Sequence, residues 1–274
     1  MCGHCGCSAD VTATVIDLHG HGHTHTHADG HTHTHDDDDG DHHHHHAHEH
    51  HDHAHGHGVT VDLETRILAK NDALAATNRA WFAGREILAL NFVSSPGAGK
   101  TTLLERTIRD LKDELPLFVL EGDQETTLDG ERIRAAGAPV VQLNTGTGCH
   151  LDAEMVARGL TALKPSVGSV VLIENVGNLV CPALFDLGER AKIVVLSVTE
   201  GEDKPLKYPH MFRAATLMLL NKIDLLPNVD FDAARAIGYA RQVNPALQVI
   251  EVSATKGDGL EAWYTYIRSS ITRS

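Results

Sequence analysis

Short apolar runs alternate with stretches of helical periodicity from residue 59 to the end of the chain. Apolar residues at helical spacing predict helices over residues 59–84, 103–111, 128–136 and 151–163, and from about residue 259. The apolar runs between them predict strands over residues 87–93, 117–120, 139–143, 170–173, 193–198, 216–220 and 247–252. This alternation is typical of a doubly wound, mainly parallel α/β sheet.

The first 58 residues lack that pattern. They contain no Lys or Arg, 20 of the 22 His and ten of the 37 acidic residues. Such a segment has too few apolar side chains to form a core. We therefore expect residues 1–58 to be a disordered metal-binding tail, and residues 59–274 to be one domain that opens with a helical segment.

Charge, the length of apolar runs and cysteine content exclude several classes of protein. The tail carries most of the formal charge of −14, so the folded part is near neutral and lacks the basic excess of a nucleic-acid-binding domain. No apolar run approaches the ~20 residues that span a bilayer, and no secretory signal is recognisable, so we expect no membrane insertion. Five cysteines, three of them within the first seven residues, fit metal or redox chemistry in a reducing cytosol. We expect a cytoplasmic protein.

The segment Ser94–Thr102 has the pattern of a phosphate-binding P-loop between a strand and a helix. Gly97 and Gly99 let backbone N–H groups turn toward phosphate oxygens, and Lys100 would reach the β- and γ-phosphates. Ser94 stands where the usual pattern has glycine, and a glycine-rich turn without a ligand is the alternative. The predicted phosphate-binding residues are Ser95, Pro96, Gly97, Ala98, Gly99, Lys100, Thr101 and Thr102.

Later strands end in motifs that indicate guanine recognition. In Asn221-Lys222-Ile223-Asp224, the carboxylate can accept two hydrogen bonds from guanine that adenine does not offer. Lys222 would lie along the base, and residues 253–254 would contact the guanine oxygen through their backbone. The predicted residues on the guanine side are Asn221, Lys222, Asp224, Ser253, Ala254 and Thr255.

Two acidic motifs predict hydrolysis of GTP to GDP. Glu174 and Gly177 stand in place of the usual Asp-x-x-Gly, whose carboxylate meets Mg²⁺ and whose glycine N–H senses the γ-phosphate. Asp123 is the candidate for orienting the attacking water or assisting Mg²⁺, with Glu121, Glu125 and Thr126–Thr127 as alternatives. The predicted catalytic residues are Lys100, Asp123 and Glu174, and the predicted Mg²⁺ residues are Thr101, Asp123 and Glu174.

A second candidate metal site lies within the folded part. Cys149-His150 ends a glycine-rich loop, and Cys181 follows Gly177 in what would be a switch loop. Two thiolates and an imidazole can hold one soft ion such as Ni²⁺ or Zn²⁺. Because cysteine is often only a small buried hydrophobe, the pairing of Cys181 with this loop stays open.

The tail carries further ligands. Cys2, Cys5 and Cys7 can bind one zinc, nickel or copper ion, and a reactive-thiol terminus is the alternative. The imidazoles predict a multi-ion reservoir, because neutral imidazole binds all three metals. An expression tag would be an uninterrupted block, whereas this series is interleaved with Asp, Thr and Gly. The reservoir residues are His21, His23, His25, His27, His31, His33, His35, His42, His43, His44, His45 and His46.

Taken together, these motifs resemble the HypB family of nickel-insertion GTPases, in the SIMIBI class of P-loop proteins. The likeness covers the Cys-x-x-Cys-x-Cys start, the His-rich tail, and residues 95–102, 121–123, 148–152, 174–182 and 197–205. It implies a homodimer that depends on nucleotide and metal, and a nickel or zinc site of Cys149, His150 and Cys181 at or near its interface. It also implies a high-affinity site at the terminal cysteines, a HypA-type nickel chaperone as partner, and delivery to the large subunit of [NiFe]-hydrogenase.

Two other functions compete with this one. A urease-type nickel GTPase would carry a Cys-Pro-His motif, whereas Cys181-Pro182 is followed here by Ala183. A plain metal-storage protein would bind ions through the tail and need no nucleotide. We therefore expect a GTP-hydrolysing metallochaperone that binds, stores and delivers Ni(II), with metal release coupled to GTP-dependent dimerisation.

Overall fold

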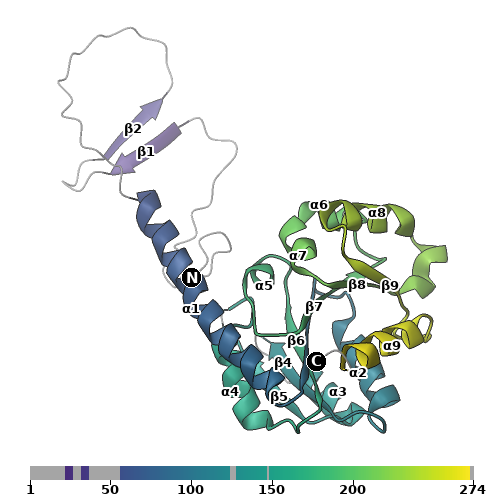
Figure 1. Ribbon diagram of the computed structural model, residues 1–274. Helices are drawn as coiled ribbons and strands as arrows, with labels where there is room; N and C mark the ends of the chain where they lie inside the picture. The colour runs from purple at the N-terminus through teal and green to yellow at the C-terminus, as the bar shows by residue number, and fades with distance from the viewer. Residues whose placement is uncertain (1–21, 27–31, 37–55, 124–127, 147, 272–274) are drawn as a thin grey trace.

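A computed structural model describes residues 22–26, 32–36, 56–123, 128–146 and 148–271. Its centre is a sheet of seven parallel strands in the order β5-β4-β6-β3-β7-β8-β9 (Figure 1). The strands are β3 (Leu88–Ser94), β4 (Leu117–Asp123), β5 (Val140–Asn144), β6 (Val170–Gly177), β7 (Ala191–Ser197), β8 (Leu217–Asn221) and β9 (Gln248–Glu251). The predicted doubly wound parallel sheet is confirmed.

Helices cover both faces of this sheet (Figure 1). The described helices are α1 (Gly56–Ala83), α2 (Lys100–Leu111), α3 (Leu128–Ala136), α4 (Ala153–Leu163), α5 (Cys181–Leu184), α6 (Lys204–Lys207), α7 (Pro209–Ala214), α8 (Ala233–Val243) and α9 (Leu260–Ile271), with a 3₁₀ turn η1 (Ile223–Asn228). Helices α2, α3 and α9 share one apolar cluster with the sheet, in which Phe92 and Trp263 meet edge to face. Helices α1 and α4 pack on the opposite face under β4 and β6, and α7 and α8 under β7 and β8.

Strand β3 occupies the middle of the sheet, between β6 and β7. All seven of its residues are buried, as the apolar run predicts for a central parallel strand. Its last residue, Ser94, pairs in register with Gly177 at the end of β6. The segments that follow these two strands therefore leave the sheet side by side, at the carboxyl edge where open α/β sheets bind ligands.

The observed elements differ from the predicted ones in two informative ways. Strand β6 continues beyond Ile173 through the Glu174–Gly177 motif, so that motif belongs to the strand rather than following it. Helix α8 was not predicted, and the two residues buried on it, Ala236 and Ala240, are both small. Its cap signal was present: the Asp232 carboxylate accepts a hydrogen bond from the Arg235 N–H.

Part of the tail is described. Residues 22–26 (β1, Gly22–Thr26) pair antiparallel with residues 32–36 (β2, Thr32–Asp36), with His23 opposite His35 and His25 opposite His33. The other reservoir residues and the terminal cysteines lie outside the described residues, namely Cys2, Cys5, Cys7, His21, His27, His31, His42, His43, His44, His45 and His46. Helix α1 begins at Gly56, close to the predicted domain start at residue 59. Among the helices described, none is long and apolar enough to cross a bilayer.

Candidate functional site

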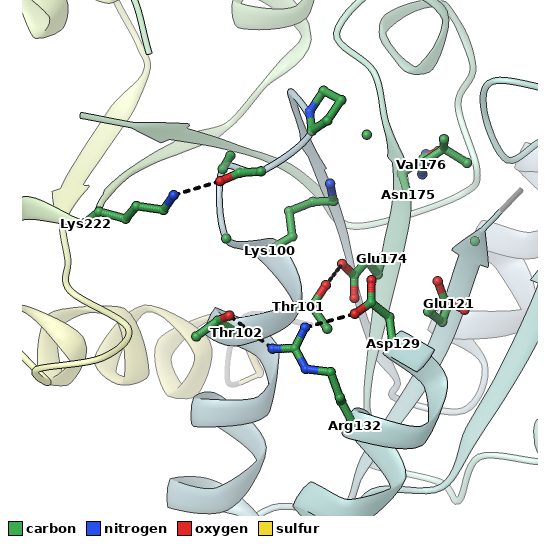
Figure 2. Close-up of a pocket in the computed structure, with 16 residues that line it drawn as sticks. Lys100, Thr101, Thr102, Glu121, Asp129, Arg132, Glu174, Asn175, Val176 and Lys222 are labelled. Atoms are coloured by element: carbon green, nitrogen blue, oxygen red, sulfur yellow. Dashed lines mark hydrogen bonds and ion pairs between the residues drawn. The ribbon is translucent and has the colours of Figure 1, made fainter. Parts of the chain in front are cut away.

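A cleft of about 560 Å³ opens at the carboxyl ends of β3, β4 and β6. Figure 2 shows the side chains that converge on it from α2, α3, β6 and the turn after β8. Its lining consists of Pro96, Gly97, Ala98, Gly99, Lys100, Thr101, Thr102, Glu121, Gly122, Asp129, Arg132, Glu174, Asn175, Val176, Gly177 and Lys222. The structure thus brings the predicted phosphate loop, Glu174, Gly177 and Lys222 to one cleft, although they come from distant parts of the sequence.

The phosphate loop has the backbone that its glycines predict. Gly97 and Gly99 adopt left-handed φ angles of 75° and 93°. A Cβ on Gly99 would lie 2.7 Å from Asn221 Nδ2, so a side chain there would displace the Asn221 amide, which donates to Ala98 O. Ser94, which replaces the usual glycine, has a partner in the loop: Lys100 Nζ donates to its hydroxyl at 2.8 Å. The departure from the pattern is therefore compatible with a complete loop.

Thr101 and Glu174 meet at the floor of the cleft. The Thr101 hydroxyl donates to Glu174 Oε1 at 2.7 Å (Figure 2). Among the residues that the structure describes, none hydrogen-bonds to the buried Oε2 of the same carboxylate. Burial raises the pKa of Glu174 to about 7, against the attraction of the nearby Lys100 ammonium. Burial also lowers the pKa of Lys100. A buried carboxylate oxygen without a partner, beside a hydroxyl, is an arrangement that a divalent cation would complete.

Gly177 lies directly against the phosphate loop. A Cβ built on this residue would fall 3.1 Å from Pro96 Cα and 3.2 Å from Pro96 N. The close approach accounts for glycine at this position, since a larger residue would push β6 and the loop apart. The end of β6 and the phosphate loop therefore pack closely against each other at this point.

The predicted guanine-binding residues lie together beside the loop. Asn221 bridges two segments: its Nδ2 donates to Ala98 O at 3.0 Å, and its Oδ1 accepts from Ala254 N at 3.3 Å. Lys222 takes a left-handed φ of 63° and donates from Nζ to Gly97 O at 2.8 Å.

The carboxylate of Asp224 is held in place by the same group of residues. Its Oδ1 accepts a hydrogen bond from the Ser253 hydroxyl at 2.6 Å, and that hydroxyl lies 3.3 Å from Thr255 Oγ1. The carboxylate that would read the base is thus oriented before any nucleotide arrives.

The candidates for orienting water are only partly described. Asp123 ends β4, where its backbone pairs with Asn144, but its side chain is outside the described part of the structure. Glu125 and Thr126–Thr127 also lie outside it. Glu121 is 2% exposed and lines the cleft. The choice among these residues therefore stays a prediction.

Two cations near the cleft were not predicted. Arg132 on α3 donates to Asp129 at 2.9 Å and to Thr102 Oγ1 at 3.2 Å (Figure 2). It also donates to Glu105 at 2.8 Å. Lys204 Nζ, from α6, donates to the Ser95 hydroxyl of the phosphate loop at 3.1 Å. No single-sequence signal marks Arg132, because it lies on a helix without a recognisable motif.

Cys149, His150 and Cys181 form a second cluster. One ligand atom from each lies within 4.8 Å of the others, and the two sulfur atoms are 2.9 Å apart as hydrogen-bonded thiols. The structure thus brings Cys181 to the Cys149-His150 loop, a pairing that the sequence left open. The His150 ring packs on Phe185, with centroids 3.9 Å apart, and burial lowers its pKa. A neutral imidazole and two adjacent thiols are a ligand set that suits a soft divalent ion.

Known proteins with similar sequences identify the family of this chain. Residues 88–251 match the family model described as the CobW/HypB/UreG nucleotide-binding domain. The chain is 60% identical over 213 residues to the hydrogenase maturation factor HypB of Rhizobium leguminosarum bv. viciae, covering 78% of this chain and 71% of that protein.

Two crystal structures of relatives are also similar. HypB of Archaeoglobus fulgidus has a TM-score of 0.70 at 38% identity, covering 74% of this chain and 99% of that one. HypB of Helicobacter pylori, solved in complex with nickel, has a TM-score of 0.71 at 36% identity, covering 74% and 96%.

Proposed function

The chain belongs to the HypB family of the CobW/HypB/UreG nucleotide-binding proteins, and on that premise we propose that it is a GTP-hydrolysing nickel metallochaperone for [NiFe]-hydrogenase maturation. In this proposal it binds, stores and delivers Ni(II), and hydrolysis of GTP governs when the metal is released. Relatives named as hydrogenase maturation factors, one of them solved with nickel, support the proposal.

One observation carries the proposal more than any other. A single stretch of chain leads from the nucleotide cleft to the metal cluster: Glu174 and Gly177 line the cleft at the end of β6, and Cys181 opens α5 immediately beyond them. The Asn178 amide between them donates to Cys149 O at 3.5 Å, so this stretch also contacts the other metal loop. A shift of Gly177 in response to the γ-phosphate would therefore displace a metal ligand.

The residues of the cleft divide the work of binding and hydrolysis. The loop of residues 95–102 holds the phosphates with its backbone N–H groups, and Lys100 leaves Ser94 to neutralise the β- and γ-phosphates. Asp224, oriented by Ser253, selects guanine, and Lys222 covers the base. Water attacks the γ-phosphorus and the bond to the bridging oxygen breaks, releasing GDP and phosphate. We assign orientation of that water to Asp123.

Magnesium fits the floor of the cleft. The Thr101 hydroxyl and the unpartnered oxygen of Glu174 would hold it, with Asp123 as a further candidate. When bound, the ion neutralises charge that develops on the phosphate oxygens. Because Glu174 must be ionised for this purpose, its raised pKa makes Mg²⁺ binding release a proton near neutral pH.

Nickel is the cargo, and zinc is the competing ion at the same ligands. Cys149, His150 and Cys181 would bind the ion as thiolates and neutral imidazole, with a remaining position for water or a partner group. GTP would favour a homodimer with this site at or near its interface. A HypA-type chaperone and the hydrogenase large subunit would be the partners, and the tail, with Cys2, Cys5 and Cys7, would collect and store the metal.

The most direct test of the enzyme assignment is GTP hydrolysis by the full-length protein with Mg²⁺. We expect release of phosphate from GTP but not from ATP, and loss of that activity in Lys100→Ala. Lys70→Ala is the matched control, because Lys70 is an exposed lysine on α1 whose ammonium pairs only at the surface with Glu154. A protein that binds nickel but hydrolyses no GTP would instead be a metal-storage protein.

A further inference from the structure

Four buried polar side chains form a continuous chain beneath the two loops that carry the metal ligands. They are Asn175 on β6, Asn91 on β3, Glu189 before β7 and Lys192 on β7, and each is at most 9% exposed. We refer to them as the polar chain. Only Asn175 lines the nucleotide cleft, so the cleft alone does not account for the other three.

One end of the polar chain holds the loop of Cys149 and His150. Asn175 Oδ1 accepts a hydrogen bond from Leu151 N at 3.1 Å, in the residue that follows His150. The Nδ2 of the same amide donates to Asn91 Oδ1 at 3.3 Å. The backbone beside His150 is thereby tied to the central strand of the sheet.

The middle of the polar chain is a buried ion pair. Asn91 Nδ2 donates to Glu189 Oε1 at 3.0 Å, and Glu189 Oε2 accepts from Leu187 N at 2.7 Å. Lys192 Nζ lies 3.8 Å from Glu189 Oε1. Replacing such a pair by apolar residues is often neutral or stabilising, so stability alone is a weak reason for its presence.

The other end of the polar chain holds the turn that carries Cys181. Lys192 Nζ donates to Pro182 O at 2.8 Å and to Phe185 O at 3.1 Å. These two carbonyls lie at the start and just beyond the end of α5, whose first residue is Cys181. Phe185 is also the ring on which His150 packs. One ammonium group therefore fixes the turn that supplies one ligand and the surface that supports another.

We propose that Lys192 and Glu189 are positioning residues for the metal, which hold the Cys181 turn at ligand distance from the Cys149-His150 loop through the polar chain. The inference rests on the proposed metal site and deepens it. Neither residue touches the ion; they act on the backbone that carries its ligands. Outer partners of this kind typically contribute about 10- to 100-fold to metal affinity.

The test uses the full chain with Cys2, Cys5 and Cys7 replaced by Ser. Thiolate-to-nickel charge-transfer absorbance then reports only Cys149 and Cys181, since imidazoles of the tail give no such band. Nickel is titrated into this parent, Lys192→Met, the double variant Lys192→Met/Glu189→Gln, and the control Lys70→Met. Urea unfolding of each protein measures its stability, so that a loss of nickel affinity caused by misplaced ligands can be told apart from one caused by partial unfolding. GTP hydrolysis is measured on the parent.

Lys192→Met leaves a buried carboxylate without its cation, so it is expected to unfold at lower urea. The double variant removes both charges and is expected to regain most of that stability. Its nickel affinity should nevertheless stay about 10- to 100-fold below that of the parent, with a weakened or shifted charge-transfer band, while Lys70→Met binds as the parent does.

A double variant that binds nickel as tightly as the parent, with the same band, would overturn the positioning role. A parent that shows no charge-transfer band at all would contradict the metal site itself. A parent that binds nickel without hydrolysing GTP would contradict the proposed function but leave the positioning role to be decided by the variants.

Discussion

The Thr101 hydroxyl donates a hydrogen bond to Glu174 across 2.7 Å, joining the phosphate loop to the strand that leads to the metal cluster. Thr101 is the second residue of α2, the helix after β3, and Glu174 lies on β6, the neighbouring strand. Any Mg²⁺ and nucleotide that alter this contact act on the same strand whose continuation bears Cys181. The predictions below follow from this connection and from the groups around it.

The buried carboxylate of Glu174 makes the stability of the protein depend on pH. Its pKa is about 7 in the folded chain, against an ordinary value of 4.5. Between these values the native state retains a proton that the unfolded state has released, so the free energy of unfolding falls as pH rises through this window. The expected loss is about 2–3 kcal/mol, measured by urea unfolding with a chelator and without nucleotide.

Glu174→Gln is the matched variant for this prediction. It keeps the shape of the side chain but cannot titrate, so its stability should decline less than that of the parent between pH 5 and 8. Parallel curves for the two proteins would show that Glu174 is not the responsible group.

Guanine selection should depend on Asp224 far more than on the residue that orients it. Asp224→Asn removes a charged acceptor of two hydrogen bonds, and we expect GTP affinity to fall by about 10²–10³-fold. Ser253→Ala removes only the hydroxyl that donates to Asp224, and we expect a loss of about 10-fold. Fluorescent GTP titration measures both, and equal losses would mean that the Asp224 carboxylate does not contact the base.

The tail and the domain should behave as separate modules. Deleting residues 18–58 removes 19 of the 22 imidazoles, so the number of nickel ions bound per chain should fall severalfold. The rate of GTP hydrolysis should not change, because the cleft is built from residues 96–222. Equilibrium dialysis and phosphate release measure the two quantities, and a loss of turnover on deletion would contradict the separation.

Much of the fold and cleft could be predicted because each signal was local. The apolar runs marked the strands, and motifs such as Ser94–Thr102 marked the ends of those strands where parallel sheets collect ligands. Glu174 and Lys100 could be placed in one cleft for this reason alone.

What could not be predicted depends on contacts between distant segments. Cys181 could not be paired with Cys149 from spacing, since the two thiols meet only because β6 and the loop after β5 leave the sheet at the same edge. Arg132 lines the cleft from α3, on which no motif marks it. Lys192 lies near the start of β7, where a lysine is not unusual in the sequence, yet its ammonium donates to the turn that carries Cys181. Such roles follow from tertiary packing and leave no local pattern.

The central claim, that nucleotide state controls metal affinity, is tested most directly by nickel titration of the protein with GDP and with a non-hydrolysable GTP analogue, with oligomeric state measured in the same samples. We predict that nickel affinity and dimer fraction both differ between the two nucleotides. Linkage then requires nickel to change the ratio of the affinities for the analogue and for GDP by the same factor as that by which the nickel affinities differ. Equal nickel affinity with GDP and with the analogue would contradict the account.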